Sequence, residues 1–262
     1  MKFIKNIVYM LAGLGFLVGC QDPDYPASVP ATGPSTESSK ILFIHASADA
    51  PNLNGLVNNT QVGNAMSLGQ ASGYGVVPVG SSQIKASAAT GDLGGVIGSG
   101  SIIYRAGATN QNNFTFVNVI NYTVIVTDTL NRPKPSTTGA TNPGGPQFLG
   151  PIIDNLTAPA SGKSGIRFFH TAAGAPSVYI TFVGPATTSF SNVAYRNSTA
   201  TFTSSTSGSY TVTVRTGSLT GTVIATTTAN LTDGKLYSIL LTGKVVSGAV
   251  KVPYAVALVQ HN

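Results

Sequence analysis

An internal repeat constrains the fold of this chain more than any other sequence feature. Residues 41–51 (ILFIHASADAP) align without a gap to residues 166–176 (IRFFHTAAGAP), and six of the eleven positions are identical. Residues 122–127 likewise match residues 237–242. The offset between the copies changes only between strand-like segments, as it does when loops vary on a fixed core. The chain is therefore expected to contain two copies of one domain.

Apolar and polar residues alternate along the strand-like segments. Tyr210, Val212 and Val214 fall on one face of a strand, whereas Thr211 and Thr213 fall on the other, so one face is expected to be buried and one solvated. After the N-terminus, no segment shows a sustained helical period of apolar residues, and Gly, Asn and Pro are frequent between the strand-like segments. The chain is therefore expected to be all-β, with antiparallel β-sandwiches favoured over a barrel.

Changes in composition mark the domain boundaries. Residues 20–39 carry four prolines and few apolar residues, which is typical of a flexible tether. Residues 157–163 form a linker of small residues. We therefore expect a signal peptide at 1–19, the tether, and two sandwiches at 40–160 and 161–262, each long enough for one hydrophobic core.

The N-terminus resembles that of a bacterial lipoprotein. Lys2 and Lys5 precede an apolar run at 7–18, which is the layout of a secretory signal and is too short to span a bilayer. The run leads into Leu17-Val18-Gly19-Cys20, where a lipobox places its modified residue, and Cys20 is the only cysteine. The resemblance implies cleavage after Gly19 and a lipid on Cys20. An ordinary signal peptide is the alternative.

The residues after Cys20 indicate the location of the protein. Asp22 and Asp24 resemble the acidic signal that sends Bacteroidetes lipoproteins to the outer face. We therefore expect an outer membrane lipoprotein that is exposed at the cell surface. Once Cys20 is acylated, no cysteine remains for a disulfide or a thiolate metal ligand, so burial alone must stabilise the fold.

The repeats also resemble a known family. Each has the pattern Ile-x-Phe-x-His followed by Ala-Pro, then Tyr74 or Phe202, and then Gly-Ser before an alternating strand. This pattern is similar to the bacterial domain-of-unknown-function family DUF4397, which occurs in exported and lipid-anchored proteins. The resemblance implies an immunoglobulin-like sandwich for each copy and no established activity. Residues 231–237 agree with it, because they look like a tyrosine corner in which the hydroxyl of Tyr237 bonds back to the preceding turn.

Two histidines occupy the same place in the two repeats. His45 and His170 share the core-facing row of their strands, whereas Arg167 lies on the alternate row and is expected to point outward. Each imidazole is expected to bond the turn before Pro51 or Pro176, because buried polar groups are normally satisfied. Each copy supplies one such His and no Cys, so no metal site is expected.

No catalytic residue or cofactor is expected either. Asp49 beside His45 could form half of a catalytic triad, but the chain lacks a Gly-x-Ser-x-Gly elbow and the second copy has Gly174 instead. A turn in which Asp49 bonds its own backbone is favoured. Glu37 is the only glutamate and lies in the tether, which argues against paired carboxylates for glycoside hydrolysis. The glycines of residues 91–100 lack the Lys-Ser/Thr of a phosphate loop.

Charge narrows the class of partner. Without residues 1–19, twelve basic residues face eight acidic ones, and the basic residues are scattered singly, so nucleic acid is not an expected partner. We expect a non-enzymatic, lipid-anchored cell-envelope protein with a binding, adhesion or scaffolding role and a protein or glycan partner at the cell surface. The alternative is a glycan-binding accessory lipoprotein of a polysaccharide-uptake system, which exposed Tyr104 and Tyr195 would favour.

The lipid on Cys20 is expected to be the sole membrane attachment. Cys20→Ser should abolish stable attachment, because nothing else in the mature chain is apolar enough to insert. Fractionation of cells that express either form measures this. A mutant that still pellets with the envelopes would contradict the assignment.

Overall fold

The computed structural model describes residues 37–105, 112–134, 143–199, 201–246 and 248–262. Within these ranges every regular element is a β-strand, which confirms the all-β class. Residues 37–262 form one compact unit. Cys20, the expected signal peptide and most of the tether lie outside the described residues. The described part of the chain contains no helix of the length and apolarity that a membrane crossing requires.

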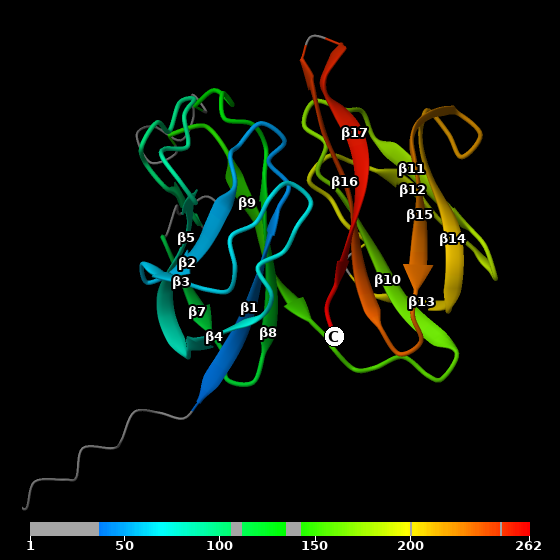
Figure 1. Ribbon diagram of the computed structural model, residues 1–262, viewed down its shortest axis with the longest axis horizontal. Helices are drawn as coiled ribbons and strands as arrows, with labels where there is room; N and C mark the ends of the chain where they lie inside the picture. The colour runs from blue at the N-terminus through cyan, green and yellow to red at the C-terminus, as the bar shows by residue number, and fades with distance from the viewer. Residues whose placement is uncertain (1–36, 106–111, 135–142, 200, 247) are drawn as a thin grey trace, which may run out of the picture. The chain divides into compact units, whose positions relative to one another are not determined.

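The first half of this unit, residues 37–154, contains two sheets, drawn from blue to green in Figure 1. One sheet has the order β4-β1-β8-β9, formed by β4 (Gly75–Pro78), β1 (Ser38–His45), β8 (Asn121–Thr127) and β9 (Gln147–Asp154). The other has the order β3-β2-β5-β6, formed by β3 (Thr60–Gln61), β2 (Leu53–Val57), β5 (Gly80–Ala88) and β6 (Ile102–Ile103), and β7 (Asn113–Phe116) also pairs with β5.

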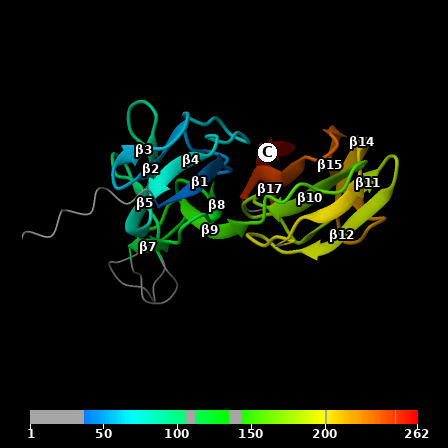
Figure 2. The same ribbon diagram turned by 90° about the horizontal axis from the view of Figure 1, so that it is seen from below.

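The second half, residues 163–262, repeats this arrangement in green to red (Figure 1). Its first sheet has the order β13-β10-β16-β17, formed by β13 (Thr203–Thr206), β10 (Lys163–His170), β16 (Leu236–Val246) and β17 (Ala249–Gln260). Its second has the order β12-β11-β14-β15, formed by β12 (Thr187–Val193), β11 (Val178–Val183), β14 (Gly208–Thr216) and β15 (Thr222–Leu231). In the view of Figure 2 the strands of each half again group together.

Each half departs from a purely antiparallel pattern at the same place. β1 runs parallel to β8, and β10 runs parallel to β16. Parallel neighbours need a long crossover between them, and here the intervening strands of the second sheet provide it. The alternating pattern of single strands carries no information about strand direction, so the sequence did not predict these pairs.

Each half encloses its own hydrophobic cluster. The first is built around buried residues such as Ile41, Phe43 and Val124, and the second around Ile166, Phe168 and their neighbours. The alternation predicted for β14 is confirmed, since Tyr210, Val212 and Val214 are fully buried while Thr211 is exposed. These clusters lie between the two sheets of each half.

A third hydrophobic cluster joins the halves. It lies between the sheet β4-β1-β8-β9 and the sheet β13-β10-β16-β17, and its buried members are Leu42, Ile44, Ala46, Ile125, Phe169, Leu240 and Val259. β1 and β10 are therefore buried on both faces. In the sequence, strands of this kind are continuous apolar runs, as Ile41 to Ile44 are. The side chains on their outer faces contact protein instead of water.

The tyrosine corner predicted in the second half is present. The hydroxyl of Tyr237 at the start of β16 accepts the backbone N–H of Thr232 at 3.1 Å. The matching Tyr122 at the start of β8 accepts the N–H of Val117 at 3.4 Å. Both tyrosines are buried, so each hydroxyl ties the entry of a central strand to the turn before it.

Removing these hydroxyls should cost unequal amounts of stability. Tyr237→Phe should lower the free energy of unfolding by about 1 kcal/mol, because the N–H of Thr232 loses its acceptor. Tyr122→Phe should cost less, because its hydrogen bond is at the long limit for an N–H donor. Urea unfolding of both variants measures the difference. Equal losses, or a larger loss for Tyr122→Phe, would show that the hydroxyls do not act through these bonds.

Candidate functional site

The strand-end histidines lie where the sequence predicted. His45 and His170 are both fully buried, and their Nε2 atoms lie 2.9 Å from the carbonyl oxygens of Pro51 and Pro176. Nδ1 of His45 also accepts the N–H of Ser47 at 3.3 Å. His45 is therefore the neutral tautomer with its proton on Nε2. Both rings close the turn that follows their strand.

Burial sets the protonation of these histidines. Desolvation lowers the pKa of His45 to about 4, against a smaller raising effect of the hydrogen bond to the carbonyl of Pro51. Burial also lowers the pKa of His170. A proton added to Nδ1 of His45 would in addition face the N–H of Ser47, so this ring is held neutral.

Asp49 does not bond its own backbone, which corrects the sequence interpretation. Its Oδ1 accepts the N–H of Leu130 at 3.0 Å, and its Oδ2 pairs with Nζ of Lys244 in β16. The residues around it do form a turn, but the carboxylate reaches across to the second half. Sequence position alone cannot show this, because the partners are 81 and 195 residues away.

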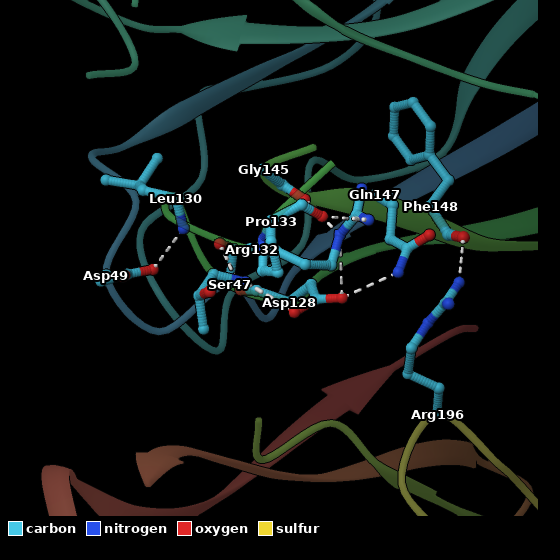
Figure 3. A network of polar contacts seen from close by, with 11 residues as sticks. Ser47, Asp49, Asp128, Leu130, Arg132, Pro133, Gly145, Gln147, Phe148 and Arg196 are labelled. Atoms are coloured by element: carbon cyan, nitrogen blue, oxygen red, sulfur yellow. Dashed lines mark hydrogen bonds and ion pairs between the residues drawn. The ribbon is translucent and has the colours of Figure 1, made fainter. Parts of the chain in front are cut away.

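A second polar cluster surrounds Asp128, directly after β8 (Figure 3). Its Oδ2 accepts a hydrogen bond from Nε2 of Gln147 at 2.7 Å and lies 3.3 Å from Nε of Arg132. The hydroxyl of Ser47 donates to the carbonyl of Asp128 at 2.8 Å. This cluster fixes the loop after β8 against the turn after β1.

Arg196 of the second half reaches toward this cluster. Its Nη2 donates to the carbonyl of Phe148 at 2.9 Å (Figure 3). Nearby, burial and then the charge of Asp128 raise the pKa of Tyr195 to about 12. The side-chain atoms Thr127 Oγ1, Tyr195 OH and Arg196 Nε are buried without a hydrogen-bond partner among the described residues.

Arg167 lies inside the molecule, which contradicts the expectation that it points outward. It is 1% exposed because the outer row of β10 packs against the first half. Its Nη2 lies 2.7 Å from Oδ1 of Asp154 in β9 and donates to Oγ1 of Thr123 at 3.1 Å. Its Nε donates to Oγ of Ser238 at 2.7 Å. One guanidinium thus joins β8, β9, β10 and β16.

A chain of hydrogen bonds continues from Arg167 through His261. Nε2 of His261 lies 2.7 Å from Oγ of Ser238 and 3.4 Å from Nη2 of Arg167, and both can donate to it. Its Nδ1 lies 2.8 Å from the hydroxyl of Tyr74. That hydroxyl donates to Oδ2 of Asp154 at 2.6 Å. The donors and acceptors are consistent only if His261 is neutral with its proton on Nδ1.

The electrostatics of the network agree with this assignment. Burial and then the charge of Arg167 lower the pKa of His261 to about 3. Burial and then the charge of Asp154 raise the pKa of Tyr74. The ring of Phe202 lies 4.4 Å from the guanidinium carbon of Arg167 and packs edge-on against His261. We call these residues the interface network: Tyr74, Thr123, Asp154, Arg167, Phe202, Ser238 and His261.

The sequence analysis missed most of the interface network. Thr123 and Ser238 do occupy matching places after the repeated tyrosines. The sequence held one signal for the interface network: a small hydroxyl residue at the same point of two otherwise apolar strands. His261 and Asp154 carried no motif, because each has partners that are distant in the sequence, including one from the other half: Tyr74 for His261 and Arg167 for Asp154.

No cluster of metal-binding side chains is evident in the part of the chain that the structure describes. Its His, Asp and Glu residues form no group of three or more that could hold a metal ion. Described residues line one pocket beside residues 155–160 and another beside β4, and the walls of these two contain neither Asp nor His. The ordered polar groups instead hold one half against the other.

Breaking the buried ion pair should be costly. Arg167→Met should lower the free energy of unfolding by about 3 to 5 kcal/mol, because it leaves Asp154 buried and without its cation. Arg215→Met, on the outer face of β14, is the matched control and should change it by less than about 0.5 kcal/mol. Urea unfolding measures both. Equal effects of the two substitutions would contradict the assigned role of Arg167.

The effect of His45→Ala should depend on pH. At pH 7 the loss of the buried imidazole should destabilise the protein by about 1 to 3 kcal/mol. A folded-state pKa near 4 lies below the unfolded value near 6.5. The unfolded state therefore binds more protons between these values, and stability falls as the pH falls from 6.5 toward 4, with a slope of up to about 1.4 kcal/mol per pH unit for this group. His45→Ala removes that slope, so it should cost less at pH 5 than at pH 7.

Urea unfolding at several pH values, together with elemental analysis, tests the role of His45. Thr228→Ala on the exposed face of β15 is the control and should cost the same at both pH values. A stoichiometric metal that disappears with His45→Ala, at unchanged stability, would show instead that the histidine is a ligand.

Comparison with known proteins gives a match to one family model. The model of a domain of unknown function, DUF4397, matches residues 39–181, from β1 into β11. No curated protein matches the sequence. The solved structure of the Bacillus anthracis TIE protein is 10% identical over 80% of this chain and 34% of its own, with a TM-score of 0.24. A leucine-rich repeat protein from Bacteroides thetaiotaomicron is 14% identical over 80% of this chain and 26% of its own, with a TM-score of 0.19.

This chain spans about a third or less of those two structures, and TM-scores this low support no inference. The match to the family model does not depend on these structures. It covers more than half of the chain and includes the histidine turn of each half. The chain therefore belongs to the DUF4397 family of domains of unknown function.

Proposed function

We propose that this protein is a lipid-anchored cell-envelope protein with a non-catalytic binding, adhesion or scaffolding role, exposed at the surface of the outer membrane. The lipobox-like sequence at Cys20 and the proline-containing tether after it support the anchor. The tether would hold the folded unit away from the lipid. The partner would be a protein or a glycan at the cell surface.

The interface network is the observation that carries the scaffold or adhesion role. Domains within one chain usually meet through modest, polar interfaces that permit relative motion. Here the interface contains a buried ion pair between Arg167 and Asp154 and a hydrophobic cluster. A unit with such a joint can present a surface at a fixed distance and orientation, which suits a scaffold or an adhesion module.

We also propose that the second half is a second copy of the family domain. Both halves have the same strand order and the same parallel pair. Both close the first strand with a histidine bonded to the carbonyl of a proline, Pro51 or Pro176. The family match ends at residue 181, and these features extend the likeness through β16.

The glycan-binding alternative finds less support. An exposed group of tyrosine side chains would favour glycan binding. Tyr104 packs edge-on against Phe114 at the first core, and the hydroxyl of Tyr195 is buried. Both side chains are only partly exposed, so they do not form the exposed group that this alternative requires.

Capture from intact envelopes tests the proposed function. The mature, acylated protein should retain a saturable protein or glycan partner, and protease added to intact cells should degrade it because it faces outward. Unfolded protein with the same lipid is the control and should retain nothing saturable. Protection from protease in intact cells would overturn the surface location. Turnover of an envelope component by the purified protein would overturn the non-catalytic role.

A further inference from the structure

A pocket beside the interface network is lined by one cation together with neutral polar and apolar residues. It has a volume of about 330 Å³ and lies between the linker after β9 and the strands β10, β13 and β16. Its wall includes Asn155, Pro159, Arg167, Phe202 and Ser204. A volume of this size lies at the lower end of the range of small-molecule sites.

Arg167 supplies the charged part of this wall. A guanidinium carries five N–H donors, and the hydrogen bonds that Arg167 makes to described residues engage Nε and Nη2. Nη1 has no protein acceptor among them, and Arg167 reaches the pocket although only 1% of it is exposed. The guanidinium is held in place on one face by the ring of Phe202, at 4.4 Å. The wall thus contains a fixed cation, and one nitrogen of that cation makes no hydrogen bond to the network.

The rest of the wall combines hydrogen-bonding and apolar groups. Thr157, Thr201 and Ser204 bring hydroxyls, and Asn155 brings an amide. Pro159, Phe202 and Leu236 are among the apolar contributors. No acidic side chain is part of the wall. The pocket therefore suits a ligand that accepts hydrogen bonds at one end and is apolar at the other.

We propose that this pocket binds a carboxylate attached to an apolar group, with the carboxylate against Nη1 of Arg167 and the apolar part against Phe202 and Leu236. Charge-assisted hydrogen bonds favour a carboxylate over a neutral acceptor. Asp154 balances the charge of Arg167, so the preference for a carboxylate comes from the charge-assisted hydrogen bond to the guanidinium and not from a net positive charge of the pocket. Two sources have this chemistry, a free small acid and the C-terminus of a polypeptide.

Titration with N-acetyl-leucine tests the proposal on the mature chain carrying Cys20→Ser, which needs no membrane. Backbone amide resonances of residues 155–160 and 201–204, and the side-chain Nε–H of Arg167, should shift and saturate with a dissociation constant on the order of 1 mM, the scale for a ligand this small. N-acetyl-leucinamide is the matched neutral probe and should bind about tenfold more weakly. No saturable shift, or equal binding of the amide, would overturn the proposal.

A pocket-filling variant locates the site without disturbing the network. Ser204→Phe places a ring at the exposed edge strand β13 and should abolish the shifts, whereas Thr228→Phe on the exposed face of β15 should leave them unchanged. Binding that survives Ser204→Phe in a folded protein would show that the ligand sits elsewhere. A tetrapeptide ending in leucine identifies the source: binding at least as tight as that of N-acetyl-leucine indicates a polypeptide C-terminus, and weaker binding indicates a free acid. This experiment does not depend on lipid anchoring or on an envelope partner, so it stands or fails separately from the proposed function.

Discussion

The buried ion pair between Arg167 and Asp154 is the contact on which the arrangement of the two halves depends. Each charge would cost several kcal/mol to desolvate alone, so neither half could bury its own member without the other. Thr123 and Tyr74 donate to the carboxylate, and Ser238 accepts from the guanidinium. Apolar contacts are non-directional and tolerate sliding, whereas these hydrogen bonds have fixed partners. The ion pair and its hydrogen bonds therefore set the register in which the apolar faces meet.

The two halves meet through corresponding faces whose residues have become complementary. Asp154 and His261 occupy equivalent places, since each pairs with the residue before one of the matched tyrosines. Arg167 likewise aligns with Leu42 of the first repeat. Two identical copies of the first half would bring two carboxylates to this interface and no cation. The differences between the repeats at these positions are what allow a closed network.

The sequence predicted the features that depend on one strand or one turn. The all-β class, the buried row of β14, the histidine turns and the corner at Tyr237 all follow from local periodicity or local hydrogen bonding. Arg167 and Asp49 were assigned wrongly because their partners, Asp154 and Lys244, come from the other half. Alternation predicts which row faces a core, but it cannot show that the other row meets a second domain. The run of apolar residues from Ile41 to Ile44 was the signal that β1 is covered on both faces.

Scarcity of charge explains why these few ionic contacts matter so much. Only 8% of the residues are charged, and two of the three ion pairs among the described residues, Arg167–Asp154 and Lys244–Asp49, join the halves. The outer face of β14 and β15 instead presents mostly hydroxyls, such as those of Thr211, Thr226 and Thr228, beside the single cation Arg215 of β14. The ion pairs seen among the described residues are therefore concentrated at the joint. A partner that met this outer face would be recognised by shape and by neutral hydrogen bonds, which salt screens far less than it screens exposed ion pairs.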